Sequence, residues 1–160
     1  MSLLRCGASV SFTWESDVVI EPIWDPDAAG PVEVGVDAIE IWRIERALSR
    51  FGERFLSRIY TEAERIRYAG RASELAARFA AKEAVMKALG TGVRGVRWRD
   101  IEVLPNRRGK PVVRLYATAA ERAQLLGLQH IAVSLTHARD LAIAVVVAVF
   151  APSHSRDRIH

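Results

Sequence analysis

Hydrophobic and polar positions divide this chain into short strand-like and helix-like segments. Val32, Val34 and Val36 alternate with their neighbours, as the residues of a half-buried strand do. Apolar residues then recur at spacings of three and four along 44–59, which predicts a helix that Gly52 interrupts. The later predicted segments are a helix over 75–89 ended by Gly90, strands over 101–104 and 111–116, a short helix ending near Gly127, and strands over 131–136 and 141–150.

The order of these segments predicts the fold class. Runs of paired strands with helices between them favour an α+β fold, with a mainly antiparallel sheet packed against helices, over a doubly wound parallel sheet. Two pairs, Thr61 with Glu64 and Thr118 with Glu121, have the spacing of a capping box and predict the first turns of two helices.

The length of 160 residues corresponds to one domain, and the apolar half of the composition is enough for a buried core. We expect the domain to span 32–151, after an N-terminal extension of unknown role over 1–31 and before a polar tail over 152–160. The single cysteine, Cys6, excludes a disulfide framework and a cysteine-based zinc cluster.

Composition also limits where the chain acts and what it meets. The longest apolar stretch, 141–151, is shorter than the roughly 20 residues of a membrane span, and no targeting segment is visible. We therefore expect a cytoplasmic protein with no membrane contact. The net charge of +4 and the pI of about 9.7 predict an acidic partner, which is a nucleic acid, a nucleotide or an acidic protein.

The helix over 75–89 carries the most informative charges. Lys82 falls inside its apolar stripe, where a charge is costly unless an anionic group meets it. Glu83 lies at the margin of the stripe, and Lys87 is its neighbour one turn later. One interpretation is an ordinary helix ion pair; the other is an anionic metal ligand between two ammonium groups, suited to a magnesium-bound diphosphate.

Asp37 follows the first strand and is predicted to open the next helix, so an N-capping role is one interpretation. The other is a metal site, because magnesium takes one or two protein carboxylates and fills its other positions with phosphate and water. Asp37 and Glu83 together meet that need if their two elements pack side by side.

Arginines recur at spacings of three and four beside the apolar stripe of 44–59. They form either a solvated face or a docking ridge for an acidic partner helix. The members of this predicted ridge are Arg43, Arg46, Arg50, Arg54 and Arg58.

Four blocks of sequence resemble the holo-acyl-carrier-protein synthase family, the small trimeric type of 4′-phosphopantetheinyl transferase. The blocks are Gly-Val-Asp at 35–37, the Arg-Phe-Ala-Ala-Lys-Glu-Ala run that opens 78–92, Gly-Lys-Pro at 109–111, and Ser-Leu-Thr-His at 134–137. They occur in the family's order, and the similarity covers about 32–150. One departure is that the aspartate of the first block lies much further from the start than is usual in the family.

The resemblance implies a specific site. Asp37 and Glu83 would bind Mg²⁺, and Lys87 would face the diphosphate of coenzyme A, so that these three residues are the expected catalytic set. Residues Gly109, Lys110, Pro111 and His137 would line the nucleotide site, to which we also assign Arg78 and Lys82. Taken on their own residues, Gly109 marks only a turn, and His137 either donates to a phosphate or caps a strand.

The resemblance also implies the reaction and its partners. The 4′-phosphopantetheine arm of coenzyme A would move to a serine of an acidic apo acyl carrier protein of fatty acid or polyketide synthesis, which leaves adenosine 3′,5′-bisphosphate. The nucleophile would be the carrier's serine, activated by a water or a carboxylate near the metal, with Glu83 the nearest candidate. A homotrimer with active sites between subunits is expected, and the arginine ridge would bind the carrier.

Two rival interpretations remain from the residues alone. A small nucleic-acid-binding module agrees with the pI and the arginine ridge, although no recognised nucleic-acid motif is present. A catalytically inactive structural subunit would lack Asp37 or Glu83, and both are present.

Overall fold

A computed structural model of the chain describes residues 31–151. The predicted tail, and all but the last residue of the predicted extension, lie outside this range. In chain order the elements are β1 (Val32–Glu40), α1 (Ile41–Phe51), α2 (Glu53–Ile59), α3 (Glu62–Tyr68), α4 (Ala72–Ala88), α5 (Gly92–Gly95), the 3₁₀ turn η1 (Trp98–Asp100), β2 (Ile101–Pro105), β3 (Pro111–Leu115), α6 (Ala117–Leu125), β4 (Leu128–His137) and β5 (Leu141–Phe150).

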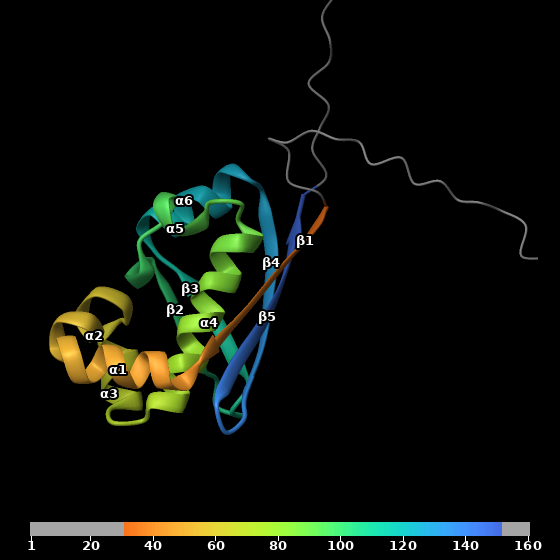
Figure 1. The fold of residues 1–160 in the computed structure, drawn as a ribbon. Helices are drawn as coiled ribbons and strands as arrows, with labels where there is room; N and C mark the ends of the chain where they lie inside the picture. The colour runs from red at the N-terminus through yellow and green to blue at the C-terminus, as the bar shows by residue number, and fades with distance from the viewer. Residues whose placement is uncertain (1–30, 152–160) are drawn as a thin grey trace, which may run out of the picture.

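Two antiparallel sheets account for the strands. The larger sheet has the order β1-β5-β4, and the smaller one is the β2-β3 hairpin. Figure 1 shows α4 lying against the three-stranded sheet, with α1, α2 and α3 beside the start of α4 and with α5 and α6 beside its end. The predicted α+β class with a mainly antiparallel sheet is therefore confirmed.

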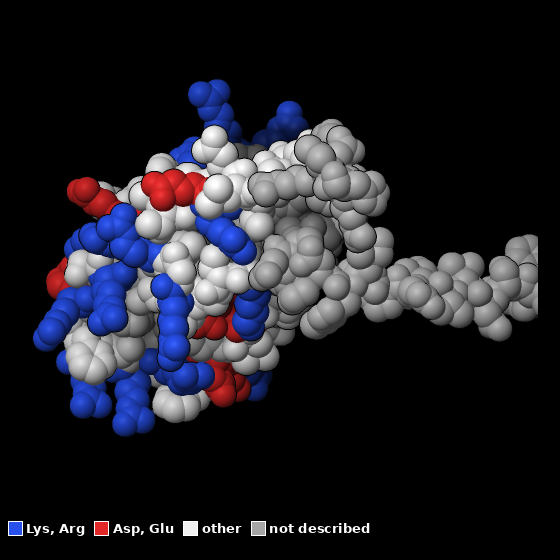
Figure 2. All heavy atoms as spheres, turned by 90° about the horizontal axis from the view of Figure 1, so that it is seen from above, with Lys and Arg blue, Asp and Glu red and all other residues white. Residues whose placement is uncertain are grey.

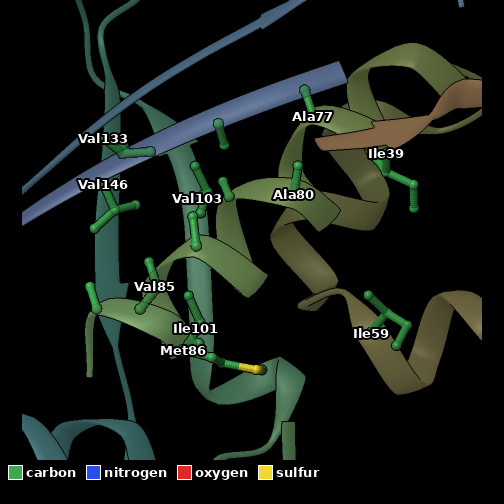
Figure 3. Close-up of a cluster of buried hydrophobic side chains, with 14 of the residues drawn as sticks. Ile39, Ile59, Ala77, Ala80, Val85, Met86, Ile101, Val103, Val133 and Val146 are labelled. Atoms are coloured by element: carbon green, nitrogen blue, oxygen red, sulfur yellow. The ribbon is translucent and has the colours of Figure 1, made fainter. Parts of the chain in front are cut away.

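Helix α4 is the centre of the hydrophobic core. Its Val85 and Met86 side chains lie near Ile101 of β2 (Figure 3), and α4 also packs along β5, whose Val146 belongs to the same buried cluster. Small side chains let the strands approach the helix closely, and burying apolar surface of this kind contributes about 25 cal/mol per Å². The buried alanines of α4 are Ala76, Ala77, Ala80, Ala81, Ala84 and Ala88.

The three-stranded sheet buries one face and leaves the other exposed. In β1 the odd-numbered residues face α4, whereas Val32, Val34 and Val36 point away and are 50–58% exposed. Val34 pairs with Val147 and Val36 pairs with Val145, so both strands contribute to one outer apolar surface. We call these five residues the outer valine face.

Local sequence signals decided several helix ends as predicted. Gly52, with a φ of +49°, separates α1 from α2. Thr61 and Glu64 form the predicted capping box: the Thr61 N–H donates to Glu64 Oε2 at 2.8 Å, and the Glu64 N–H donates to the Thr61 hydroxyl at 3.3 Å. Gly90, with a φ of +65°, follows the C-cap of α4 as expected.

The second predicted capping box is wrong. Helix α6 begins at Ala117 with Tyr116 as its N-cap, so Thr118 is already inside the helix. The Thr118 hydroxyl donates instead to Asp100 Oδ2 at 2.5 Å, and the Thr118 N–H donates to the same oxygen at 3.2 Å. A carboxylate that is distant in sequence thus replaces the local partner.

Candidate active site

Strand β1 and helix α4 touch at Gly35, and this contact positions the site. A Cβ atom at Gly35 would lie 1.9 Å from the Ala84 carbonyl oxygen and 3.1 Å from the Ala88 nitrogen. Only glycine permits this approach of the two backbones. Asp37 lies two residues further along the same face of β1, so its side chain also points towards α4.

The N-capping interpretation of Asp37 is wrong. Strand β1 does not end at Val36 but continues to Glu40, and α1 begins at Ile41. The extension is held by pairing with β5, in which Asp37 lies opposite Ala144. Asp37 is therefore an interior residue of a strand, held on the α4 side of the sheet.

Lys87 joins the two elements. Its ammonium donates to Asp37 Oδ1 at 2.9 Å and to the Val36 carbonyl oxygen at 2.7 Å. The Lys87 side chain is 51% exposed and that of Asp37 is 11% exposed, so the pair sits at the surface with the lysine outermost. The cation remains accessible to an anionic ligand.

Glu83 completes this cluster. Its partial burial raises the pKa of the Glu83 carboxyl, and the negative charge of Asp37 and a hydrogen bond with Asp37 raise it further. The positive charges of Lys87 and Arg43 act in the opposite direction. Two carboxylates from different elements thus lie next to each other, with cations on either side.

A second polar cluster lies near the start of α4. Arg78 donates to the Tyr68 hydroxyl at 2.6 Å and forms an ion pair with Glu74, while its guanidinium carbon lies 4.0 Å from the centre of the Tyr68 ring. His137 Nε2 is 4.0 Å from Glu74 Oε1. Glu74 is nine positions before Glu83, or about 13 Å along α4, and Arg78 is five positions before it, or about 7.5 Å.

The Gly109-Lys110-Pro111 segment forms the turn of the β2-β3 hairpin. Gly109 has a φ of +82°, and Asn106 Oδ1 accepts hydrogen bonds from the Arg108 and Lys110 N–H groups at 2.9 and 3.1 Å. These bonds account for the turn without a ligand. The nucleotide-binding role of this segment stays a prediction, as does that of His137.

The prediction that Lys82 contacts coenzyme A is contradicted by its burial. Lys82 is fully buried, and its ammonium lies 2.8 Å from Glu64 Oε2. It also donates to the carbonyl oxygens of Ile59, Trp98 and Ile101 at 3.0, 3.1 and 2.5 Å. Helical periodicity correctly placed Lys82 on the buried face, but the anionic group that meets it is Glu64.

The sequence predicted Glu64 as a member of a capping box but not as the buried partner of Lys82. Besides closing the capping box, it accepts a hydrogen bond from the Val103 N–H at 2.9 Å and pairs with Lys82. The available signal was the unpaired charge of Lys82, which required a buried anion somewhere in the chain. Tyr68 and Glu74, which hold Arg78, had no comparable signal.

The predicted arginine ridge spans two helices. Arg43, Arg46 and Arg50 lie on α1. The Nη1 atom of Arg43 is 3.5 Å from Oε2 of Glu40. Arg54 lies on α2, beyond Gly52. Seen from above, Lys and Arg side chains cover much of the side on which the helices lie, with fewer acidic side chains among them (Figure 2).

Two negative findings concern residues 31–151. No group of three or more histidine, cysteine, aspartate or glutamate side chains is placed to hold a metal ion in this range. The Asp37–Glu83 pair has only two members, which is the number of protein carboxylates that magnesium commonly takes. None of the described helices has the length and apolar character needed to cross a membrane.

Comparison with known proteins agrees with this geometry. The sequence model of the 4′-phosphopantetheinyl transferase superfamily matches residues 33–146, so the chain belongs to that family. Within it, the holo-[acyl-carrier-protein] synthase of Herpetosiphon aurantiacus is 52% identical over an alignment of 122 residues that covers 72% of this chain and 96% of that protein. The synthase of Solibacter usitatus is 49% identical over 120 residues, again 72% of this chain and 96% of the relative.

Solved structures give the same result. The Helicobacter pylori holo-[acyl-carrier-protein] synthase in complex with coenzyme A superposes with a TM-score of 0.67 at 32% identity, over 72% of this chain and 98% of that one. The Bacillus anthracis enzyme in complex with CoA (3′,5′-ADP) has a TM-score of 0.61 at 35% identity, over 74% and 96% of the two chains. The family resemblance predicted from the four blocks is confirmed, and the nucleic-acid interpretation loses its basis.

Proposed function

We propose that this chain transfers the 4′-phosphopantetheine arm of coenzyme A to a serine of an apo acyl carrier protein. The observation that carries the proposal is the meeting of Asp37, Glu83 and Lys87 at the Gly35 contact. Relatives that match nearly their whole length to this chain are holo-[acyl-carrier-protein] synthases. The adjacent carboxylates argue against a catalytically inactive subunit.

The reaction is a phosphoryl transfer. A bond forms between the serine Oγ and the β-phosphorus of coenzyme A, and the bond from that phosphorus to the bridging oxygen breaks, which releases adenosine 3′,5′-bisphosphate. The serine proton passes to a water or a carboxylate at the site. Such reactions depend mainly on positioning and on stabilising negative charge.

Asp37 and Glu83 fit a magnesium ion, since both offer hard oxygen donors from rigid elements. When bound there, Mg²⁺ would supply the positive charge that stabilises the diphosphate and the leaving group. Lys87 adds a cation fixed by Asp37 and the Val36 carbonyl, and half of its side chain is accessible to the same phosphates. Metal dependence therefore belongs to the proposal.

The assembly belongs to the proposal as well. Within one chain, Arg78 lies about 7.5 Å along α4 before Glu83, and His137 is near Glu74, about 13 Å before Glu83 along the helix. A second copy of the chain would help to complete a nucleotide site of this length. The outer valine face, which is apolar and exposed, suits such contact between subunits. We therefore propose a homotrimer with its active sites between subunits.

The test is direct. The protein is incubated with coenzyme A, an apo carrier protein and Mg²⁺, and the carrier is examined by mass spectrometry for the added phosphopantetheine. We expect the mass gain with Mg²⁺ and its loss on chelation. No gain with any of several carriers would refute the function, whereas a gain unaffected by chelation would refute only the metal. Light scattering after size exclusion tests the trimer separately.

A further inference from the structure

Three hollows on the helical side of the molecule are neighbours, because each shares a lining residue with the next. The first lies on α1 and is lined by Trp42, Arg43, Arg46, Arg50 and Phe51. The second, on α2, shares Phe51 with the first and adds Arg54, Phe55 and Arg58. The third shares Arg58 with the second and is completed by Arg94, Arg97, Trp98, Arg99 and Thr118. Arg58 is the one member of the expected arginine ridge that lines the third hollow, whose other arginines lie outside that ridge.

The third hollow, which we call the loop pocket, has a volume of about 530 Å³ and an excess of positive charge. Arg58, Arg94 and Arg99 are exposed and form no ion pair with any residue of 31–151. Arg97 pairs with Asp100 at 3.1 Å, but that carboxylate is buried and also accepts hydrogen bonds from Thr118. The pocket thus presents several guanidinium groups whose charges an acidic ligand would neutralise.

The loop pocket also lies close to the proposed reaction centre. The Trp98 ring stacks on Phe79 of α4, with 4.5 Å between ring centres and 27° between planes. Phe79 is one helical turn before Glu83. Burial and Asp37 raise the pKa of Glu83, and on the α1 side the charge of Arg43 offsets part of that rise. Glu83 is therefore one helical turn from a residue that contacts the loop pocket, and its carboxyl also interacts with Arg43 of the first hollow.

A partner that delivers a serine to Glu83 comes close to both of these basic surfaces. If it rests on α1 alone, the loop pocket is left uncovered beside it. Guanidinium groups bind carboxylates through paired hydrogen bonds, and a patch of them accelerates encounter and discriminates among acidic partners.

We propose that the loop pocket is a second docking site for the acidic carrier protein, and that Arg94 and Arg99 contribute to the choice among carriers. This inference rests on the proposed transferase function. Its ligand is an acidic patch on the protein partner, and not the diphosphate of coenzyme A.

The test compares charge reversals at matched positions. We expect Arg94→Glu and Arg99→Glu each to raise the KM for the apo carrier about threefold, and the double variant about tenfold. The KM for coenzyme A and kcat at saturating carrier should stay within twofold of wild type. The effect should shrink as salt rises, because exposed charges are screened.

Arg67→Glu is the matched control, since Arg67 is an exposed arginine of α3 that lines none of the three hollows. It makes the same change in net charge and should leave the carrier KM unchanged. Circular dichroism checks that every variant is folded. If Arg67→Glu raised the carrier KM equally, only net charge would matter and the docking site would be contradicted. An unchanged carrier KM in the double variant would also contradict the docking site.

The remaining outcomes are also decisive. A rise in the KM for coenzyme A with no change for the carrier would assign the loop pocket to the nucleotide and overturn the inference. If the wild-type protein modifies no carrier, the proposed function fails. The docking site is then judged by fluorescence anisotropy of a labelled acidic carrier with wild type, the double variant and the Arg67→Glu control: weaker binding of the double variant alone supports it, and equal binding overturns it.

Discussion

Helix α4 carries two lysines five residues apart, and each one contacts a carboxylate at nearly the same distance. Lys82 and Glu64 are 2.8 Å apart and fully buried, whereas Lys87 and Asp37 are 2.9 Å apart and the Lys87 side chain is 51% exposed. The ammonium group of the buried Lys82 is surrounded by protein partners, which are Glu64 and three carbonyl oxygens. The exposed lysine keeps a side open to a ligand, so burial and not the ion pair itself separates a structural lysine from a functional one.

The largest expected effect follows from removing the buried lysine. Lys82→Met should lower the free energy of unfolding by about 3–5 kcal/mol, because Glu64 and three carbonyl oxygens lose their partner inside the core. Chemical denaturation measures this. Lys87→Met is the matched control and should cost about 1 kcal/mol or less. Equal losses for the two variants would contradict the distinction.

The exposed lysine should show the opposite pattern. Lys87→Ala should reduce kcat roughly 100-fold, as removal of one fixed positive donor at a developing charge does, with little change in stability. The measurement is the rate of carrier modification by mass spectrometry, alongside a thermal melt. A normal rate in a folded variant would remove Lys87 from the proposed catalytic set.

The contact at Gly35 holds helix α4, which carries both lysines, close to strand β1. Gly35→Ala should destabilise the fold by about 1–3 kcal/mol, since the new methyl group overlaps the Ala84 carbonyl and forces β1 away from α4. Activity should fall further than stability alone explains, because Asp37 moves with the strand. Val34→Ala, one residue earlier on the outer face, is the control, and its transfer rate per folded chain should exceed that of Gly35→Ala.

The sequence predicted a structural feature correctly when the residues that determine it are close together in the chain, and missed it when they are far apart. The capping box at Thr61 and the breaks at Gly52 and Gly90 rest on neighbouring residues, and the sequence predicted them. Asp37 was misplaced because β1 is extended to Glu40 by pairing with β5, about a hundred residues later. Lys82 was placed on the correct face, but its partner Glu64 lies on another helix, which periodicity does not reveal.

The smallest expected effect on stability concerns the ion pair between Asp100 and Arg97. Burial opposes ionisation of Asp100, but hydrogen bonds from Thr118 and Arg97 and the charge of Arg97 outweigh it and hold the pKa of Asp100 below its usual value. Asp100→Asn should therefore lower stability by about 1 kcal/mol at pH 7.

The sign follows from the lowered pKa. The stabilisation is present above the unfolded pKa of about 3.9 and is lost as pH falls through the lower folded pKa. Urea titrations at pH 7 and pH 3 should show the gap between wild type and Asp100→Asn narrowing at the acidic end. A gap that widens there would contradict the assignment.

The outer valine face has a consequence for how the protein responds to dilution. In the proposed trimer, folding would be coupled to association through this face, so that mass action would add to the stability of each subunit. The melting temperature would then rise with protein concentration, and a dilute sample would lose its structure at lower temperatures than a concentrated one. Stability becomes a property of the population of chains as well as of the sequence.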